Sequence, residues 1–498
     1  MRLNILFGGP AGTGPNILTH ILAEALVAKG YYVFYARDYQ SLIRGGHNFN
    51  VLTISEEPVN SNDSEIDVLV CLDETTKKMH EKDLKKDGIL ISKEKEPNMY
   101  FAGRIFKLLG LELEDLYAQF KKLEKRYEEN VKESKQGYEE EKETMKLPES
   151  PKIKANFSNG SQGIRDGALK SGLEIYYAYP MTPATPVLTE LSQAMLDKKN
   201  KHLTVELENE IAVANAGVGS CMAGGKVMVG TSGGGFDLMG ETLSLTGIAE
   251  IPLVFYLAQR PGPGTGVATY TGQGDMKIAL NSGHGEFSRI VVAPGDPLEA
   301  EELTNAAFYF SHKFKTPSII LSDKHLGESF YTGVGKPELE KIEVTTKLSR
   351  FNSYEVDSES SATEDPKIIE KEIIRRMKKI WEIEKEAKKF EGYKIYGNEN
   401  SENVIVSWGS TKGAILDSIK ELDVKFVQIL FLEPFSKEVA KELEGKNILL
   451  VENNSTAPLA NLIREKTGIV IEDKNKILRF DGRPFLADEL KMEIKKRI

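Results

Sequence analysis

The chain has 498 residues, of which 40% are hydrophobic, and its formal net charge is −10. This length and apolar content predict about three globular domains with buried cores. The acidic balance argues against general binding to nucleic acids or anionic membranes, because most of the surface would repel either partner. Apolar runs stay below the roughly 18 residues of a membrane helix, and the stretch behind Met1 is too short for a signal peptide. We expect a cytoplasmic protein that binds neither nucleic acid nor membrane.

The cysteine content limits the chemistry that the chain supports alone. Its two cysteines, Cys71 and Cys221, lie far apart in the sequence. They offer neither a disulfide framework nor a CxxC site for a metal or cluster. An iron–sulfur centre, if the protein works with one, has to sit on another chain.

The first 110 residues alternate strand-like and helix-like segments, which is typical of a βαβ domain with a parallel sheet. The strand candidates are "LNILFGG", "YYVFYA", "IDVLVCLD" and "GILISK", and "NILTHILAEALVAKG" has helical periodicity. Residues 111–155 are rich in Glu and Lys and predict an exposed helical connector that ends at two prolines. We assign residues 1–150 to this domain and its connector.

Two further α/β units follow, so the predicted fold class is α/β with three α/β domains. Residues 160–345 contain strand candidates such as "KVMVGTS", "IPLVFYLA" and "PSIILSD". Residues 346–395 change to a polar stretch and a charged helix, which we interpret as a linker and a surface helix. Residues 396–498 return to α/β alternation, with strand candidates "NVIVSWGS", "FVQILFLEPF" and "NILLVENN".

A glycine loop, "FGGPAGTGPN" at 7–16, follows the first strand and opens a helix. It matches neither the Walker loop, which needs Lys and Ser/Thr after its last glycine, nor the GxGxxG dinucleotide spacing, although Asp38 lies near the end of the second strand. A tight turn and a nucleotide site both remain open. "RGGHN" at 44–48 is equally ambiguous.

The middle domain has two glycine-rich loops, "GTSGGGFDLM" at 230–239 and "QRPGPGTGVATYTGQGD" at 259–275. Glycine has no Cβ, so backbone N–H groups in such loops can approach a ligand closely. Two loops of this kind in one domain predict a pocket, but they do not identify its ligand.

Several motifs in a fixed order resemble one enzyme family. "YPMTP" (179–183), "ELENEIAVANAGVGS" (206–220), "TSGGGFDLM" and "AQRPGPGTG" (258–266) resemble the alpha subunit of 2-oxoacid:ferredoxin oxidoreductases. "GGPAGTG" and "RGGHN" are similar to the gamma subunit, here fused in front of alpha, and "VIVSWGSTKGA", "LEPF", "VENN" and "DGRPF" to the C-terminal transketolase-like domain. The resemblance covers nearly the whole chain and implies a gamma-type domain, a thiamine diphosphate pyrimidine-binding domain and a transketolase-like domain.

The resemblance implies a catalytic role for Glu210. In thiamine enzymes a glutamate hydrogen-bonds N1′ of the aminopyrimidine and promotes the tautomer that takes the proton from C2. Such a carboxyl should be poorly solvated, because burial strengthens the hydrogen bond that it shares with the ring. Glu210 precedes a small and apolar run, whereas Glu206 and Glu208 flank a strand-like stretch. The alternative is a helix-start carboxylate favoured by the macrodipole.

The resemblance also implies the substrate and cofactor residues. Thr182 and Arg260 match positions that contact the substrate carboxylate, for which a guanidinium offers a paired-donor fork. The alternatives are a turn-stabilising hydroxyl and a surface salt bridge. His284 lies in a region similar to the 2-oxoglutarate-type branch. At position 234 this chain has glycine where the family usually has proline. The resemblance implies a cofactor cavity lined by Tyr179, Pro180, Ser232, Gly233 and Gly234.

The chain lacks parts that the family's reaction needs. It has no GDG motif for the Mg²⁺ that binds the diphosphate and no cysteine set for a [4Fe–4S] cluster. The resemblance places both on a beta subunit, in a dimer of alpha–beta pairs. It implies oxidative decarboxylation of a 2-oxoacid such as 2-oxoglutarate or pyruvate, with coenzyme A as acyl acceptor and ferredoxin as electron acceptor. A non-catalytic assembly subunit and a nucleotide-binding α/β enzyme are the alternatives.

Overall fold

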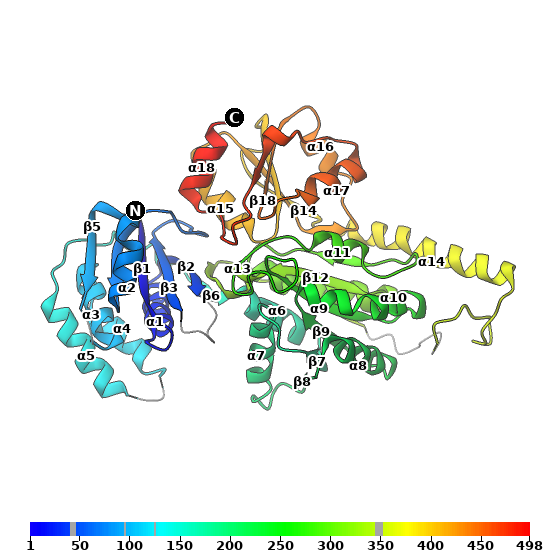
Figure 1. Cartoon of the computed structure of the whole chain (residues 1–498), viewed down its shortest axis with the longest axis horizontal. Helices are drawn as coiled ribbons and strands as arrows, with labels where there is room; N and C mark the ends of the chain where they lie inside the picture. Colours follow the sequence, from blue (N-terminus) through cyan, green and yellow to red (C-terminus); the bar gives the residue numbers. More distant parts are fainter. Residues whose placement is uncertain (40–45, 94–95, 124–125, 344–351) are drawn as a thin grey trace.

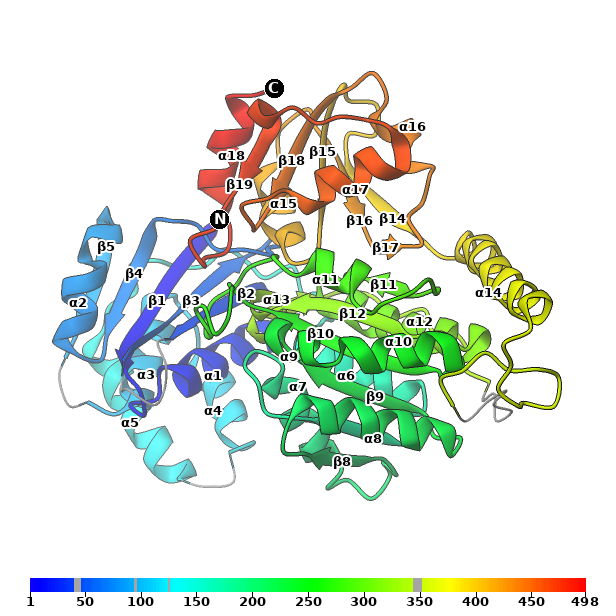
Figure 2. The ribbon, with the colours of Figure 1, turned by 45° about the vertical axis from the view of Figure 1, so that its right-hand side comes forward.

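The computed structural model describes residues 1–39, 46–93, 96–123, 126–343 and 352–498. Their strands form two seven-stranded sheets and one five-stranded sheet. Figures 1 and 2 show the N-terminal domain beside the central domain, with the C-terminal domain resting on both. The α/β class agrees with the sequence.

The N-terminal sheet has the strand order β5-β4-β1-β3-β2-β13-β6. β1 runs parallel to β4 but antiparallel to β3, so the sheet is mixed and the predicted parallel sheet is wrong. The sequence did not predict β3 because its two asparagines, Asn48 and Asn50, are unfavourable in strands. Both are buried, and Asn50 Nδ2 donates a hydrogen bond to Asn16 Oδ1 at 3.0 Å. The elements are β1 (Arg2–Pro10), α1 (Pro15–Ala28), β2 (Tyr32–Tyr39), β3 (His47–Ser55), β4 (Ile66–Cys71), α2 (Glu74–His80), β5 (Leu84–Ser92) and α3 (Asn98–Leu108).

Two strands from outside the predicted domain complete this sheet. β13 (Phe330–Gly333) pairs antiparallel with β2, and β6 (Asn156–Asn159) pairs antiparallel with β13. The boundary that we drew at residue 150 therefore passes in front of strands that belong to the N-terminal sheet. Because each strand is short, neither carried a clear strand signal in the sequence.

The segment that we predicted as an exposed connector is packed. It forms α4 (Leu113–Phe120) and α5 (Tyr127–Glu140), and α4 buries Leu116 and Phe120 in the N-terminal core. A Cβ built on Gly137 would lie 1.9 Å from the carbonyl oxygen of Tyr100, so the backbones of α3 and α5 touch. The high charge of the segment reflects only its outer faces, and the prediction of an exposed connector is wrong.

The central sheet has the order β17-β11-β12-β10-β9-β7-β8 and is parallel except for β17 at its edge. Helices cover both faces, as an all-parallel arrangement requires. The elements are α6 (Gly160–Lys170), β7 (Ile175–Ala178), α7 (Thr185–Ala194), β8 (Leu203–Glu206), α8 (Glu210–Met222), β9 (Val227–Thr231), α9 (Gly233–Leu238), α10 (Gly240–Ala249), β10 (Leu253–Gln259), α11 (Met276–Asn281), β11 (Ile290–Val292), α12 (Pro297–Phe314), β12 (Ser318–Asp323) and α13 (Lys324–Glu328).

The charged helix of the predicted linker is α14 (Pro366–Ala387). Its N-cap, Asp365, accepts a hydrogen bond from the backbone N–H of Lys367 at 2.8 Å. Only Ile383 is fully buried among its residues. Figure 1 shows α14 reaching beyond the central domain, as expected for a surface helix.

The C-terminal sheet has the order β14-β16-β15-β18-β19. The C-terminal domain also contributes one strand, β17, to the central sheet, where it pairs antiparallel with β11. In the described residues no helix combines the length and the apolar character needed to cross a bilayer. The elements are β14 (Tyr393–Gly397), β15 (Asn403–Trp408), α15 (Thr411–Ser418), β16 (Lys425–Ile429), β17 (Phe431–Glu433), α16 (Val439–Leu443), β18 (Asn447–Glu452), α17 (Pro458–Thr467), β19 (Lys476–Leu478) and α18 (Ala487–Lys495).

A buried ion cluster joins the C-terminal domain to the central one. Lys412, 6% exposed, forms ion pairs with Asp296 and with Glu299, the latter at 2.6 Å. Glu299 also accepts a hydrogen bond from Gln428 at 2.7 Å. Pairing offsets the cost of burying Lys412 and Glu299, which would be large for either charge alone.

Candidate active site

The predicted site residues gather at the carboxyl edge of the central sheet. Thr182 lies in the segment after β7, Ser232 follows β9 directly, and Arg260 follows β10 directly. β7 pairs with β9 and β9 with β10, all parallel, so these three segments are neighbours. Ligands in open α/β sheets bind at this edge.

Glu210 is the first residue of α8, and its side chain is buried. Asn209, the N-cap, accepts a hydrogen bond from the backbone N–H of Ala212 at 2.9 Å. Glu210 is 3% exposed, whereas Glu206 and Glu208 are exposed. The position in the first turn suits the macrodipole alternative, but stabilisation by a helix dipole does not require burial.

The carboxyl group of Glu210 lies against α9 and lacks a protein partner. Its Oε1 atom is buried and has no hydrogen-bond partner among the described residues. A Cβ built on Gly235 would lie 2.6 Å from this oxygen and 2.1 Å from Thr231 Oγ1. Only glycine therefore fits at 235, and the carboxyl is held in a narrow space. A buried acceptor without a partner is costly, so a ligand that donates a hydrogen bond there would stabilise the site.

The loop that opens α9 presents a second free polar atom. Ser232 is fully buried, and its Oγ has no hydrogen-bond partner among the described residues. At Gly234 an added Cβ would meet nothing within 4 Å, so the helix start faces open space at this residue. Ser232, Gly233 and Gly234 lead directly into Gly235, which packs against Glu210, and their contact with a cofactor stays a prediction.

Asp275 is a site residue that the sequence analysis missed. An added Cβ on Gly233 would lie 2.5 Å from Asp275 Oδ2, so this carboxyl packs against the first turn of α9. Oδ2 is buried without a hydrogen-bond partner among the described residues. Burial, with a contribution from Asp237, raises the pKa of Asp275 to about 6 despite the opposing charge of Arg260. The only sequence signal was its place at the end of the glycine-rich loop.

Arg260 and Thr182 are in direct contact. Arg260 Nη1 donates a hydrogen bond to the carbonyl oxygen of Thr182 at 2.7 Å. Burial lowers the pKa of Arg260, and the charge of Asp275 opposes this effect, but a guanidinium stays charged in proteins. Within the described residues no carboxylate lies within 4.0 Å of Arg260, so the surface salt-bridge alternative finds no support.

Tyr179 and Pro180 lie at the same edge but are exposed on this chain. Their contact with a cofactor stays a prediction. His284 is also exposed, and its carbonyl oxygen accepts a hydrogen bond from Ser244 Oγ at 2.7 Å. Its side chain lines a hollow between α10 and α14 rather than the space around Glu210.

The C-terminal domain holds the loop that ends at Asp275. The backbone N–H of Gln273 donates to the carbonyl oxygen of Asn453 at 2.8 Å, and Gln273 Oε1 accepts from the backbone N–H of Asn453 at 2.9 Å. Gln273 Nε2 also donates to the carbonyl oxygen of Trp408 at 3.0 Å. Two of the predicted C-terminal motifs, "VENN" and "SWGS", therefore act on the site through this loop.

The neighbouring carboxyl, Glu452, is fully buried. It accepts hydrogen bonds from Trp408 Nε1 at 2.7 Å and from the backbone N–H of Leu459 at 3.2 Å. Burial raises the pKa of Glu452 to about 7, although these donors oppose the rise. We call the contacts of Gln273 with Trp408 and Asn453 the loop clamp. Glu452 supports it, because this carboxyl binds Trp408 and directly precedes Asn453.

The N-terminal glycine loop is explained by the fold. Gly12 and Gly14 have φ values of 90° and 86°, which favour glycine. A Cβ on Gly14 would lie 2.1 Å from Asn98 Nδ2. These contacts favour the tight turn over the nucleotide site. In "RGGHN", Arg44 and Gly45 lie outside the described residues.

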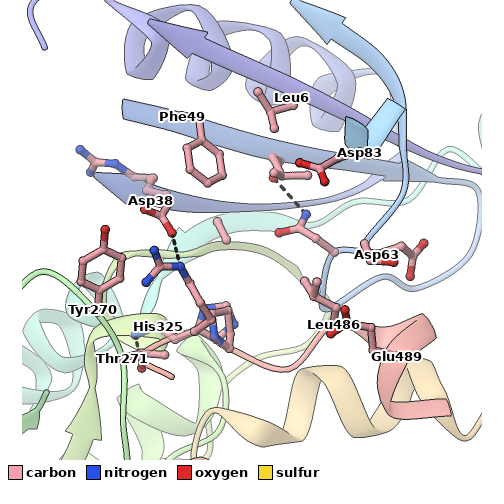
Figure 3. A pocket seen from close by; sticks show the side chains of 18 of the residues that line it. Leu6, Asp38, Phe49, Asp63, Asp83, Tyr270, Thr271, His325, Leu486 and Glu489 are labelled. Carbon is pink, nitrogen blue, oxygen red and sulfur yellow. Dashed lines mark hydrogen bonds and ion pairs between the residues drawn. The ribbon is translucent and has the colours of Figure 1, made fainter. Parts of the chain in front are cut away.

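Asp38, which the nucleotide alternative required, forms an ion pair with Arg483 at 2.9 Å. Figure 3 shows Asp38 at a hollow between the N-terminal sheet and the segment that carries Leu486. Arg483 lines the same hollow, whose volume is about 290 Å³. Arg483 also lies over the ring of Tyr270, 3.8 Å from its centroid. The predicted motif "DGRPF" thus holds the N-terminal domain against the loop of the active site.

Comparison with known proteins agrees with this arrangement. Residues 166–393 match the family model described as pyruvate flavodoxin/ferredoxin oxidoreductase, thiamine diphosphate-binding, and residues 4–97 match the model for pyruvate ferredoxin/flavodoxin oxidoreductase. The chain is 29% identical to the alpha subunit of a 2-oxoacid:ferredoxin oxidoreductase from Sulfolobus sp, over 98% of this chain and 96% of that one. It is 28% identical to the corresponding subunit from Saccharolobus solfataricus, over 99% and 98%.

A solved structure shares the fold of the whole chain. The 2-oxoglutarate:ferredoxin oxidoreductase from Magnetococcus marinus, solved with 2-oxoglutarate, coenzyme A and succinyl-CoA bound, superposes with a TM-score of 0.89. The match covers 100% of this chain and 99% of that one at 21% identity. At this identity the likeness concerns the fold.

Proposed function

We infer that this chain is an alpha subunit of a 2-oxoacid:ferredoxin oxidoreductase and supplies the catalytic acid of that enzyme. The enzyme oxidises a 2-oxoacid with loss of CO₂, depends on thiamine diphosphate and coenzyme A, and passes the electrons to ferredoxin. Two family models of one enzyme, which together match more than half of the chain, and relatives aligned over nearly its full length support this function.

The buried carboxyl of Glu210 carries the proposal. It is 3% exposed, has an oxygen without a partner among the described residues, and is held in place by Gly235. These features fit the aminopyrimidine end of thiamine diphosphate, which offers a ring nitrogen that shares a proton with a carboxyl. When bound, thiamine diphosphate supplies a nucleophilic carbon for the keto group and accepts the electron pair released with CO₂.

Residues of this chain would position the reacting groups. Glu210 would hold the proton at its Oε1 atom, and Ser232 would add a hydroxyl at the border of the same space. Arg260, fixed by the carbonyl oxygen of Thr182, would bind the substrate carboxylate with its remaining guanidinium N–H groups. Asp275, with a pKa of about 6, would set the charge beside Arg260.

The rest of the site would come from a beta subunit. This chain has no GDG motif, and its two cysteines are buried far apart in different domains. We therefore assign the Mg²⁺–diphosphate site and the [4Fe–4S] cluster to the partner, in a dimer of alpha–beta pairs. Ile211 and Leu238, each 51% exposed beside the site, suit a surface that a partner covers.

The decisive experiment replaces Glu210 with Gln in the complex with its partner subunit. Glutamine keeps the volume but cannot share a proton in the same way, so substrate-dependent reduction of a low-potential acceptor should fall about 100-fold or more. Glu208→Gln, two residues away and exposed, should retain activity. Both variants should assemble normally. Full activity of Glu210→Gln would exclude the proposed role.

A further inference from the structure

The helix α14 buries Ile383 but leaves a group of large apolar side chains exposed on its outer face. Four apolar residues of its middle section are exposed, namely Ile373 (40%), Ile374 (48%), Met377 (37%) and Trp381 (66%). A surface helix of a globular protein normally turns such a stripe to the core. A contiguous exposed stripe of this kind, with Trp and Met in it, is typical of a protein–protein interface.

Ion pairs on the inner side fix this orientation. Arg375 makes a paired contact with Glu250, at 3.1 Å and 2.6 Å, and Lys379 contacts the same carboxyl. Burial alone would raise the pKa of Glu250, but hydrogen bonds and charges from Arg375 and Lys379 lower it to about 2. Glu386 accepts a hydrogen bond from Tyr309 Oη at 2.8 Å. The helix is therefore anchored from Arg375 to Glu386, and rotation of the apolar stripe toward the core would break these contacts.

A row of lysines borders the apolar stripe. Its members are Lys367, Lys371, Lys378 and Lys385, whose spacings of 4, 7 and 7 residues put them along one side of a helix. All four are exposed, and within the described part of the chain no carboxylate lies within 4.0 Å of their ammonium groups. On a chain with a net charge of −10 this row is a local basic surface. Two copies of α14 packed together would bring such rows close, so an acidic partner surface fits better.

The surface continues toward the active site. Ile373 and Met377 of α14 line a hollow of about 360 Å³ together with Leu245 and Ile248 of α10. α10 in turn contacts α8 and α9, which carry Glu210 and Gly235. Figures 1 and 2 both show α10 lying between α14 and these two helices. A protein that covers the site at Glu210 can follow α10 and reach α14.

We propose that the outer face of α14, with the hollow beside α10, docks the beta subunit through an apolar surface bordered by carboxylates. This rests on the proposed function, because the beta subunit is the partner that completes the active site. α14 supplies a second contact that is remote from the chemistry. The apolar stripe contributes to affinity, and the lysine row contributes to the rate and the salt dependence of assembly.

Cysteine labelling of the complex tests the contact. In Met377→Cys the new thiol is the accessible one, because Cys71 and Cys221 are buried. We expect the beta subunit to slow maleimide labelling of position 377 at least tenfold. Val470→Cys, which replaces another exposed apolar residue, on the C-terminal domain, should label equally fast with and without the partner. Equal labelling of position 377 in both states would overturn the proposal, and so would thiol cross-linking of two copies through this position.

Assembly affinity provides a second measurement. Trp381→Glu should weaken binding of the beta subunit at least tenfold, and Lys378→Glu should weaken it with a shallower dependence on salt, whereas Val470→Glu should leave it unchanged. Unchanged affinity in Trp381→Glu would contradict the proposal. If the wild-type complex oxidises 2-oxoacids but Met377→Cys stays equally reactive with the partner, only the docking surface is wrong. If Met377→Cys is protected by the partner but the wild-type complex is inactive, the proposed function fails instead.

Discussion

Gly234 and Gly235 are adjacent in α9, but the space around them differs. An added Cβ at 235 would lie 2.1 Å from Thr231 Oγ1 and 2.6 Å from the Glu210 carboxyl, whereas at 234 it would meet nothing within 4 Å. Position 234 is also where the family usually has proline. The buried carboxyl of Glu210 therefore requires glycine at position 235, whereas position 234 has room for a side chain.

This difference predicts opposite outcomes for two matched substitutions. Gly235→Ala should displace the Glu210 carboxyl and lower the turnover of the assembled enzyme about 100-fold, since misplacement by about 1 Å has effects of this size. Gly234→Ala should stay within about threefold of wild type. Both changes raise helix propensity equally, so propensity cannot explain a difference. Similar turnover in the two variants would contradict the role of Gly235.

The prediction of Glu210 rested on the family resemblance, and local signals selected it among the neighbouring carboxylates. Three carboxylates stood within five residues, and only Glu210 led into an apolar run; its burial agrees with that choice. The sequence analysis missed Asp275 because its position at the end of a glycine-rich loop does not by itself indicate a buried carboxyl. Its burial comes from Gly233 and from Gln259, whose Oε1 accepts the Asp275 backbone N–H at 2.9 Å. Contacts between such distant positions leave no local pattern.

At the scale of elements, the loop clamp around β18 makes stability depend on pH. The pKa of Glu452 is about 7 in the folded chain, above the ordinary value of 4.5. The folded state therefore binds more protons than the unfolded state between these values, and its stability falls as pH rises from about 4.5 to 7. The loss is on the order of 3 kcal/mol, at 1.36 kcal/mol per pKa unit.

Glu452→Gln should remove this dependence. The amide oxygen still accepts the hydrogen bond from Trp408 and carries no charge at any pH. We expect the fall in Tm between pH 5 and pH 8 to be clearly smaller in the variant than in wild type. Glu444→Gln, at an exposed position, should keep the wild-type fall. An identical pH dependence in Glu452→Gln and wild type would show that Glu452 does not titrate in this range.

Some elements could be predicted from sequence and others could not, for physical reasons. The core strands of the central and C-terminal sheets are continuous apolar runs, as expected for strands with both faces covered. β3 was missed because Asn48 and Asn50, polar residues that disfavour strands, are buried there. α4 and α5 were taken as exposed because their composition is charged, although Phe120 lies in the core. The composition of a segment averages over all sides of a helix, whereas only one side of the helix is buried. A mostly charged helix can therefore still pack against the core.

At the scale of the whole molecule, Lys412 holds two domains together. Its removal would leave the buried Glu299 with Lys394, whose Nζ lies 3.6 Å from Glu299 Oε1, and would leave Asp296 without its ion pair to Lys412. Lys412→Met should therefore lower the free energy of unfolding by about 3–5 kcal/mol, as measured by denaturant titration. In the Lys412→Met background, Glu299→Gln should restore part of the lost free energy of unfolding, because it removes the buried negative charge that Lys412 had paired. Lys441→Met, at an exposed ion pair with Glu438, should have no measurable effect. A small effect of Lys412→Met would indicate that water reaches the cluster.

The domain plan itself showed the limit of sequence reasoning at this scale. The order of the motifs predicts three consecutive α/β units. In the structure, however, β6 and β13 belong to the N-terminal sheet and β17 belongs to the central sheet. Strand exchange between units depends on edge pairing between short segments. Such pairing is decided by three-dimensional proximity.

The late arrival of β13 has a consequence for synthesis on the ribosome. β2 ends at Tyr39, but the strand that pairs with its outer edge is Phe330–Gly333. At roughly 5–20 residues per second, translation leaves that edge without its strand for about 15–60 s. An unpaired edge is a template for association with other chains. The nascent N-terminal domain should therefore need a chaperone, or slow folding, until the ribosome has translated about two thirds of the message.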